Sequence, residues 1–150
     1  MHAAGTGGSI ARLHLSNQHH ALSELSAWLA ELAAQRDLPP RVAFRLELVL
    51  TEAVTNIMDH AAGTERAGRI DLACQIDADA VRIVLSDDGA AFDPTARMEV
   101  VLPESLDIAR PGGLGIHLMR RYTRTMAYRR EDDRNVLSLT LPRADEPLAP

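Results

Sequence analysis

Two hydrophobic periods alternate along this chain, and each change of period marks the boundary of an element. Apolar side chains recur every three or four positions over residues 19–36 and 40–61, which predicts two amphipathic helices. Prolines precede the second helix, and a glycine follows it as a stop signal. A third helical pattern opens at residues 111–115 and continues through four apolar residues, Ile116, Leu118, Met119 and Tyr122.

Period-two alternation predicts strands at about residues 10–15, 69–76, 80–86, 125–130 and 136–141. Short polar segments at 77–79 and 131–135 join neighbouring strands as turns, and residues 95–110 are less regular. This order of elements predicts an α/β protein of the α+β type. We expect a two-layer sandwich in which helices cover one face of a mixed, mostly antiparallel sheet.

Length and composition narrow the class of protein. A chain of 150 residues predicts a single domain over 1–150, with a core at about 10–142 and loose tails at 1–8 and 144–150. A net charge of −5 and an aromatic content of 3% disfavour direct nucleic-acid binding. No apolar run is long enough to cross a membrane and no signal peptide is evident, so we expect a cytoplasmic protein. The single cysteine, Cys74, allows no intrachain disulfide and is expected to be buried.

The second helix carries a polar pair at the margin of its apolar face. Glu52 and Asn56 lie four positions apart and therefore stack on successive turns. These two residues alone leave two interpretations open. Either the pair meets solvent or backbone at a helix edge, or a carboxylate and an amide point into a pocket, where they could hold a hard cation and take up a proton.

Two further features are ambiguous when each is taken alone. Asp87 ends a predicted strand two positions before Gly89, a pattern that marks many turns but also places a carboxylate where it could accept a hydrogen bond from an exocyclic amine. The glycine-rich segment 112–115 enters a helix, where it could cap the helix or bind phosphate through backbone N–H groups. It is neither a Walker loop, because no Lys-Ser or Lys-Thr follows, nor a Rossmann fingerprint, because no strand precedes it.

Taken together and in this order, the motifs resemble the GHKL ATPase superfamily, and within it the bacterial anti-sigma-factor serine/threonine kinase family. The motifs are Glu-Ala-Val-Thr-Asn at 52–56 with His60, Asp87 and Gly89 followed by Phe92-Asp93-Pro94, and Gly112-Gly113-Leu114-Gly115 with Ile116 and Leu118. The resemblance spans about residues 10–142 and implies a Bergerat fold with a short ATP lid. A histidine kinase would also need a phosphoacceptor dimerisation helix, for which this chain has no room.

The resemblance implies a role for each matching position. Glu52 takes the place of the general base that accepts the proton of the substrate serine, and Asn56 that of the Mg²⁺ ligand that ties the metal to the phosphates of ATP. Asp87 takes the position that binds the adenine amine. The other implied nucleotide-binding positions are Gly89, Ala91, Gly113, Leu114 and Gly115. His60 is expected to pack and to form hydrogen bonds rather than to act in catalysis.

The implied function is an ATP- and Mg²⁺-dependent serine/threonine protein kinase that acts as an anti-sigma factor in a partner-switching system. Its partners would be an anti-sigma-factor antagonist protein, as the phosphorylation substrate, and a sigma factor or similar regulatory target; a homodimer is also implied. The alternatives are an ATP-gated protein-binding module without significant kinase activity and a regulatory kinase whose output is not a sigma factor. Arg110 could face solvent or reach phosphate or a partner. The arginines that could face solvent or dock an acidic partner are Arg120, Arg121, Arg124, Arg129 and Arg130.

Overall fold

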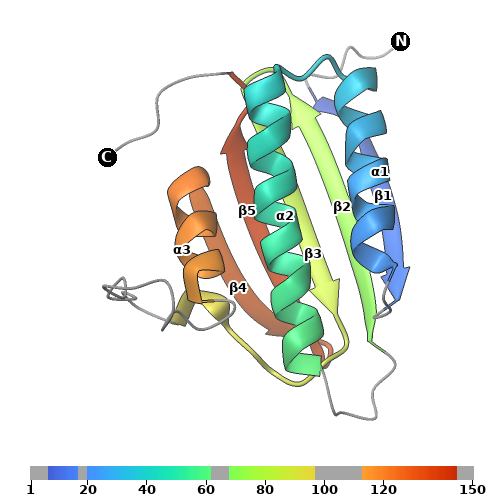
Figure 1. The fold of residues 1–150 in the computed structure, drawn as a ribbon. Coiled ribbons are helices and arrows are strands. Elements are labelled where there is room, and N and C mark those ends of the chain that lie inside the picture. Colours follow the sequence, from blue (N-terminus) through green and yellow to red (C-terminus); the bar gives the residue numbers. More distant parts are fainter. Residues whose placement is uncertain (1–6, 17–19, 62–67, 97–112, 145–150) are drawn as a thin grey trace.

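The computed structural model describes residues 7–16, 20–61, 68–96 and 113–144. Five strands and three α-helices make up most of these residues (Figure 1). The elements are β1 (Gly7–Ser16), α1 (Ala21–Gln35), α2 (Pro40–Ala61), β2 (Arg69–Asp77), β3 (Ala80–Asp87), the short 3₁₀ helix η1 (Pro94–Ala96), α3 (Gly113–Tyr122), β4 (Thr125–Glu131) and β5 (Arg134–Pro142). Because β1 begins at Gly7, the last two residues of the predicted N-terminal tail belong to a strand.

The strands form a single sheet in the order β1-β2-β3-β5-β4, and α1, α2 and α3 lie on one face of it (Figure 1). The two-layer α+β architecture with helices on one face is therefore confirmed. Every strand pairing among the described residues is antiparallel, so these pairings contain no parallel pair of the kind that a mixed sheet would have. Two of the four pairings, β2–β3 and β4–β5, join strands that are linked by short turns, whereas α1 and α2 lie between β1 and β2 in the chain.

The core lies between the sheet and the helices. Every second side chain of β2 is buried, and α2 buries one apolar stripe against the sheet. Each fully buried aliphatic side chain contributes about 1.5–3 kcal/mol relative to an exposed one. Cys74 lies in this core, and its burial raises the pKa of the thiol to about 12. Among the described helices, none combines the length and the hydropathy that crossing a lipid bilayer requires.

The turn between β4 and β5 is shorter than the sequence predicts. Asp132 and Asp133 both have positive φ, at 51° and 62°, which is the backbone of a two-residue type I′ hairpin turn. The expected turn at residues 131–135 is therefore wrong at both ends, because β4 extends to Glu131 and β5 begins at Arg134. Asparagine and aspartate tolerate this backbone better than most residues, so two aspartates can form the turn alone. The longer strand brings Asn135 into the sheet.

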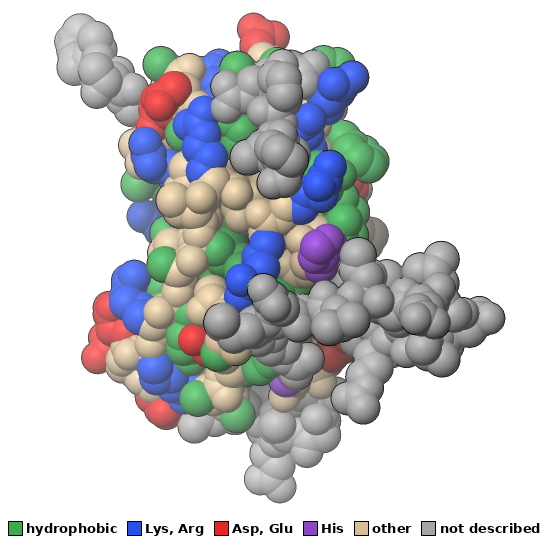
Figure 2. Space-filling model, turned by 90° about the vertical axis from the view of Figure 1, so that its left-hand side faces the viewer, with side chains coloured by type: hydrophobic (Ala, Val, Ile, Leu, Met, Phe, Trp, Pro, Cys, Tyr) green, Lys and Arg blue, Asp and Glu red, His purple; other side chains and the backbone are tan. Residues whose placement is uncertain are grey.

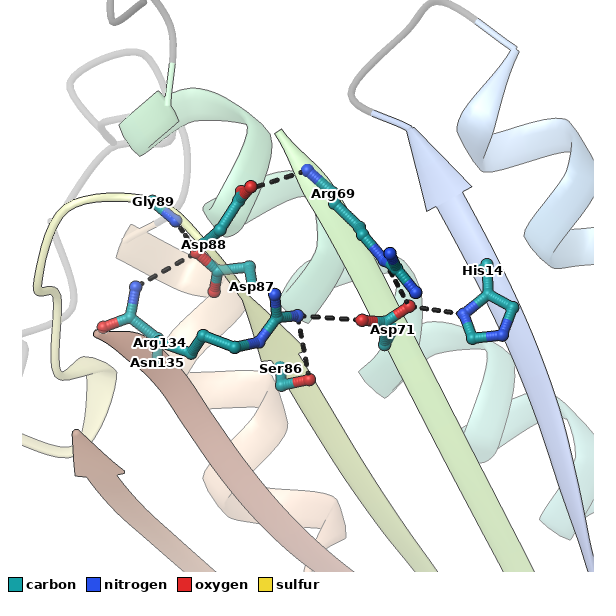
Figure 3. Close-up of polar contacts among 9 residues, drawn as sticks. All are labelled: His14, Arg69, Asp71, Ser86, Asp87, Asp88, Gly89, Arg134 and Asn135. Atoms are coloured by element: carbon teal, nitrogen blue, oxygen red, sulfur yellow. Dashed lines mark hydrogen bonds and ion pairs between the residues drawn. The ribbon is translucent and has the colours of Figure 1, made fainter. Parts of the chain in front are cut away.

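The sheet face that is turned away from the helices carries a polar cluster around Asp71 (Figure 3). One carboxylate oxygen accepts hydrogen bonds from His14 and from Arg69 Nε, the latter at 3.2 Å. The other accepts from Arg134 Nη2 at 2.8 Å, and Arg134 also reaches Ser86 Oγ at 3.2 Å. Burial acts to raise the pKa of Asp71, but the hydrogen bonds and charges of His14 and Arg69 outweigh it and hold that pKa below its ordinary value.

Candidate functional site

A cavity opens beside α2, at the end of β3. It has about 440 Å³ of empty space, part of which is open to solvent. Its wall is mostly apolar, with a few polar groups converging on it. The described residues that line it are Ala53, Asn56, Ile57, His60, Leu85, Asp87, Ala90, Phe92, Pro94, Met119, Tyr128, Asn135 and Leu137.

Asp87 is the buried carboxylate of this wall. It is the last residue of β3 and its relative exposure is 6%. Its Oδ1 accepts a hydrogen bond from the Gly89 N–H at 2.9 Å and one from Asn135 Nδ2 at 3.0 Å (Figure 3). No described residue donates to Oδ2. Asp87 therefore lines the cavity with one oxygen held by the protein and one left for a ligand.

Gly89 shapes this carboxylate without lining the cavity itself. A Cβ at position 89 would lie 2.9 Å from Asp87 Oδ1, too close for any side chain unless the carboxylate moves. The Gly89 carbonyl accepts a hydrogen bond from Arg130 Nη1 at 2.8 Å. Of the two alanines that follow, Ala90 lines the cavity, whereas Ala91, the position expected there, is exposed and is not among the described lining residues.

Asn135 is a residue of the site that the sequence pattern did not reveal. It lies directly opposite Asp87 in the β3–β5 register, and its relative exposure is 7%. Its side-chain nitrogen donates to Asp87 Oδ1 and to the Ala90 carbonyl at 2.9 Å. The one signal that could have found it is the Asp132-Asp133 pair, since two such residues can form a hairpin turn and leave position 135 inside a strand.

Asn56 lines another part of the cavity, and its relative exposure is 5%. Its Nδ2 points at Met119 Sδ of α3, 3.9 Å away, where the sulfur is a weak acceptor. No described residue donates to its Oδ1, so this oxygen is available to a cation. Glu52 is half-buried one turn earlier on α2, and it is not among the described residues that line the cavity. The structure thus brings Asn56 and Asp87 to one cavity and leaves Glu52 beside it.

His60 and Phe92 form a stacked pair in the wall, with ring centroids 3.5 Å apart and an angle of 21° between the rings. His60 Nδ1 lies 2.8 Å from the Asn56 carbonyl oxygen. Because a carbonyl only accepts, Nδ1 is the nitrogen that carries the proton. This geometry matches the expected packing and hydrogen-bonding role of His60.

The helix α3 begins at Gly113, so Gly113, Leu114 and Gly115 form its first turn rather than a loop before it. The first N–H groups of a helix have no partner within the helix, and the helix dipole favours anions there. The helix packs against α2, and its Met119 reaches the cavity. Gly112 and Arg110, together with most of the expected lid, lie outside the described residues.

Comparison with known proteins assigns this architecture to a family. A model of the histidine kinase-like ATPase domain matches residues 15–141, which is most of the chain. The chain belongs to that family. It is similar to the serine/threonine-protein kinase BtrW of Bordetella bronchiseptica, with 35% identity over 134 residues that cover 89% of this chain and 94% of BtrW. It also matches the serine-protein kinase RsbW of Staphylococcus epidermidis, with 37% identity over 78 residues, 49% of either chain.

Solved structures show the same fold for this histidine kinase-like ATPase domain. The RsbU and RsbW domains of a Mycobacterium tuberculosis protein align with a TM-score of 0.65 at 16% identity, covering 91% of this chain and 34% of that one. The SiaB–SiaC complex of Pseudomonas aeruginosa aligns with a TM-score of 0.57 at 17% identity, covering 88% of this chain and 89% of the other. These matches show the fold, and the serine and serine/threonine protein kinases among the relatives agree with the protein-kinase activity that the sequence motifs predicted.

The arginines of α3 and β4 are dispersed on the surface of this kinase domain. Figure 2 shows arginine side chains spread over one side of the molecule, with apolar and uncharged groups between them. Arg120 Nη2 donates to the Thr95 carbonyl at 2.7 Å, and Arg129 Nε pairs with Glu131 at 2.7 Å. Arg130 instead donates to the Gly89 carbonyl, in the loop after β3 that borders the cavity. Most of the described arginines of the predicted basic cluster therefore bond to nearby groups of the same chain, and Arg130 bonds to the loop that follows Asp87.

Proposed function

We propose that this chain is a Mg²⁺- and ATP-dependent serine/threonine kinase that acts as an anti-sigma factor in a partner-switching system and phosphorylates an anti-sigma-factor antagonist protein. The proposal is carried by two buried side chains that line the same cavity of this kinase-family domain. One is a carboxylate and the other an amide, and each has an oxygen to which no described residue donates. Asp87 supplies the first and Asn56 the second.

The carboxylate suits an adenine base. An ionised aspartate only accepts hydrogen bonds, and the exocyclic amine of adenine donates them. Asp87 Oδ2 is the free acceptor, and the apolar lining of the cavity suits the faces of a purine. GTP is disfavoured because guanine presents a carbonyl oxygen where adenine presents the amine, which would leave two acceptors facing each other.

The amide suits a hard cation that is shared with phosphate. Mg²⁺ prefers oxygen ligands, keeps several waters and often takes only one or two protein groups along with substrate phosphates. Asn56 Oδ1 fits this role because the Asn56 amide nitrogen is turned toward Met119. Among the described residues, no group of three or more His, Cys, Asp or Glu side chains could hold a metal by itself. A cation here would thus depend on the nucleotide for its other ligands. We further assign the phosphates to the N–H groups of Gly113, Leu114 and Gly115 at the start of α3.

Glu52 is the proposed general base. It lies one helical turn before Asn56, next to the cavity rather than in its wall, which suits a group that meets a second protein instead of the nucleotide. As the serine hydroxyl oxygen attacks the γ-phosphorus, the bond from that phosphorus to the bridging oxygen of ADP breaks and Glu52 takes the hydroxyl proton. Mg²⁺ would neutralise charge on the phosphates.

The protein partners follow from similarity rather than from a visible surface. BtrW and RsbW are named as serine or serine/threonine protein kinases, and SiaB was solved in complex with a second protein, SiaC. An antagonist protein as the substrate and a sigma factor or similar target as the second partner are the partners that the sequence motifs imply. The alternative is an ATP-gated binding module without significant kinase activity, in which Glu52 would not act as a general base.

Glu52→Gln separates these functions. The variant keeps the size of the side chain but cannot accept the hydroxyl proton, so phosphoryl transfer should fall by about 10²–10⁴-fold with ATP affinity nearly unchanged. The measurement is phosphoserine or phosphothreonine formed with time on the antagonist-like protein encoded near the gene, together with calorimetry for ATP. Glu47→Gln is the matched control, because Glu47 lies on the same helix, is exposed and bonds Ser26 away from the cavity. Transfer by Glu52→Gln at the wild-type rate would exclude the base role. Tight ATP binding without any transfer by the wild type would favour the binding module.

A further inference from the structure

Among the described residues that line the cavity, Asn135 has the side chain with the most hydrogen bonds. We propose that it is a positioning residue for base recognition, which holds one oxygen of Asp87 so that only the other can meet the base and thereby sets the preference for adenine over guanine. This inference rests on the proposed function, because it assigns a second residue to the same nucleotide site.

The orientation of the Asn135 amide is fixed by its partners. Three donors converge on Oδ1, which are the Phe92 N–H at 3.1 Å, the Tyr128 hydroxyl at 2.6 Å and Arg130 Nη1 at 3.1 Å. Two groups that can only accept, the Asp87 carboxylate and the Ala90 carbonyl, face Nδ2. A flipped amide would place an oxygen against both acceptors and an NH₂ group against three donors, so only one orientation satisfies the site.

This fixed amide in turn restricts the carboxylate of Asp87. The terminal torsion of an aspartate is broad and nearly two-fold, so an unrestrained carboxylate can rotate. Asn135 Nδ2 and the Gly89 N–H both hold Oδ1, from the neighbouring strand and from the following turn (Figure 3). With Oδ1 held by two donors, Oδ2 is the oxygen to which no described residue donates, and the protein itself fixes its direction.

Discrimination between purines depends on that restraint. A fixed acceptor rewards the amine of adenine and opposes the carbonyl of guanine at the same place. A carboxylate that is free to turn can move away from that carbonyl or accept the ring N–H of guanine instead. Loss of the Asn135 donor should therefore reduce the selectivity for the base more than it reduces the stability of the fold.

The neighbouring residue Arg134 provides a matched control. It lies next to Asn135 in β5, but its side chain extends to the opposite face of the sheet, where it contacts Asp71 and Ser86 (Figure 3). Removing Arg134 perturbs the same strand without removing a donor to Asp87. If the only effect is on the stability of the strand, variants at Arg134 and Asn135 should both show it. A change in the preference for ATP over GTP should appear only in the variant at Asn135.

The test compares Asn135→Val with Asn135→Thr, which have similar shape and both favour strands, although only threonine can donate a hydrogen bond to Asp87. Calorimetry with ATP and with GTP gives the ratio of the two dissociation constants. We expect Asn135→Val to lower the wild-type preference for ATP by about tenfold, the equivalent of one lost buried hydrogen bond, and Asn135→Thr to keep most of it. Arg134→Ala should keep the ratio while lowering the melting temperature.

The outcomes distinguish failure of the role of Asn135 from failure of the proposed function, nucleotide binding at this cavity. An unchanged ratio in folded Asn135→Val, or an equal loss in Arg134→Ala, would overturn the role of Asn135 and leave ATP binding intact. Failure of the wild type to bind either nucleotide would instead overturn the proposed function. If Asn135→Val does not fold, Arg130→Gln removes one donor to the Asn135 oxygen and the bond to the Gly89 carbonyl, and an unchanged ratio there counts against the proposal.

Discussion

Two parts of the cavity are built in different ways: the base-facing part around Asp87, which we propose binds the base, and the metal-facing part around Asn56, which we propose binds the cation. At the base-facing part, Asp87, Gly89 and Asn135 are joined by hydrogen bonds from two strands and a turn. At the metal-facing part, the described contacts of the Asn56 side chain are limited to a long one with the Met119 sulfur. The difference indicates that the protein alone fixes the geometry of the first part, whereas under the proposed function the phosphates and the cation would complete the second.

The largest effect should come from breaking the preformed part. Asp87→Asn replaces an acceptor with an amide whose NH₂ group must face either the adenine amine or the donors from Gly89 and Asn135. A mispaired buried group costs about 1–3 kcal/mol, so ATP and ADP affinity should fall by about 10–100-fold, with or without Mg²⁺. Calorimetry on a variant shown to be folded by circular dichroism checks this. Wild-type affinity in that variant would remove Asp87 from the site.

A smaller and conditional effect is expected at the metal-facing part. Asn56→Ala should abolish the tightening of ATP binding by Mg²⁺ and leave the weaker metal-free binding in place, because it removes the proposed protein ligand of the cation. The measurement is ATP affinity in MgCl₂ and in EDTA. Thr55→Ala, at a half-buried position that is not among the described lining residues, is the control. Wild-type Mg²⁺ dependence in Asn56→Ala would contradict the assignment.

The smallest effect should come from the outer face of the sheet, behind the base-facing part. The pKa of Asp71 is lowered in the folded protein, so its stabilisation is fully present above its ordinary value of 3.8 and is lost as the pH falls through the folded-state value. Asp71→Asn should therefore cost about 1 kcal/mol or less at pH 7 and still less under acid conditions. Urea unfolding of both proteins at pH 7 and near pH 3 measures this. A stability difference that does not shrink in acid, or a change in ATP affinity, would contradict it.

The helices and most strands were predictable because local periodicity determines them. The apolar stripe of α2 predicted that helix over its observed length. The alternation of apolar and polar residues in β2 and β3 predicted which side chains face the core. The β4–β5 turn was not predictable in the same way. Arg134 and Asn135 are polar strand residues whose partners, Asp71 and Asp87, come from distant parts of the chain, so their polarity looks like that of a turn until the sheet is formed.

The residues of the candidate site likewise divide into those that a local sequence motif revealed and those whose partners are distant in the chain. Asp87 and Asn56 were found because each belongs to a local motif, and the structure brings both to one cavity. Asn135 was missed because no local motif contains it, and Ala90 rather than Ala91 lines the cavity because of how the loop after β3 is held. The catalytic role of Glu52 and the phosphate-binding role of residues 113–115 stay predictions.

The two-residue hairpin turn at Asp132 and Asp133 also bears on how this protein could diverge. Side chains in a strand alternate between faces, so an insertion or deletion of a single residue in that turn would exchange the faces of β5 next to the site. Arg134 or Val136 would then point at Asp87, and the amide of Asn135 would be turned to solvent. Loops usually tolerate changes of length, but in this hairpin the gain or loss of one codon would change the proposed base-binding part of the cavity without substituting any residue of its wall.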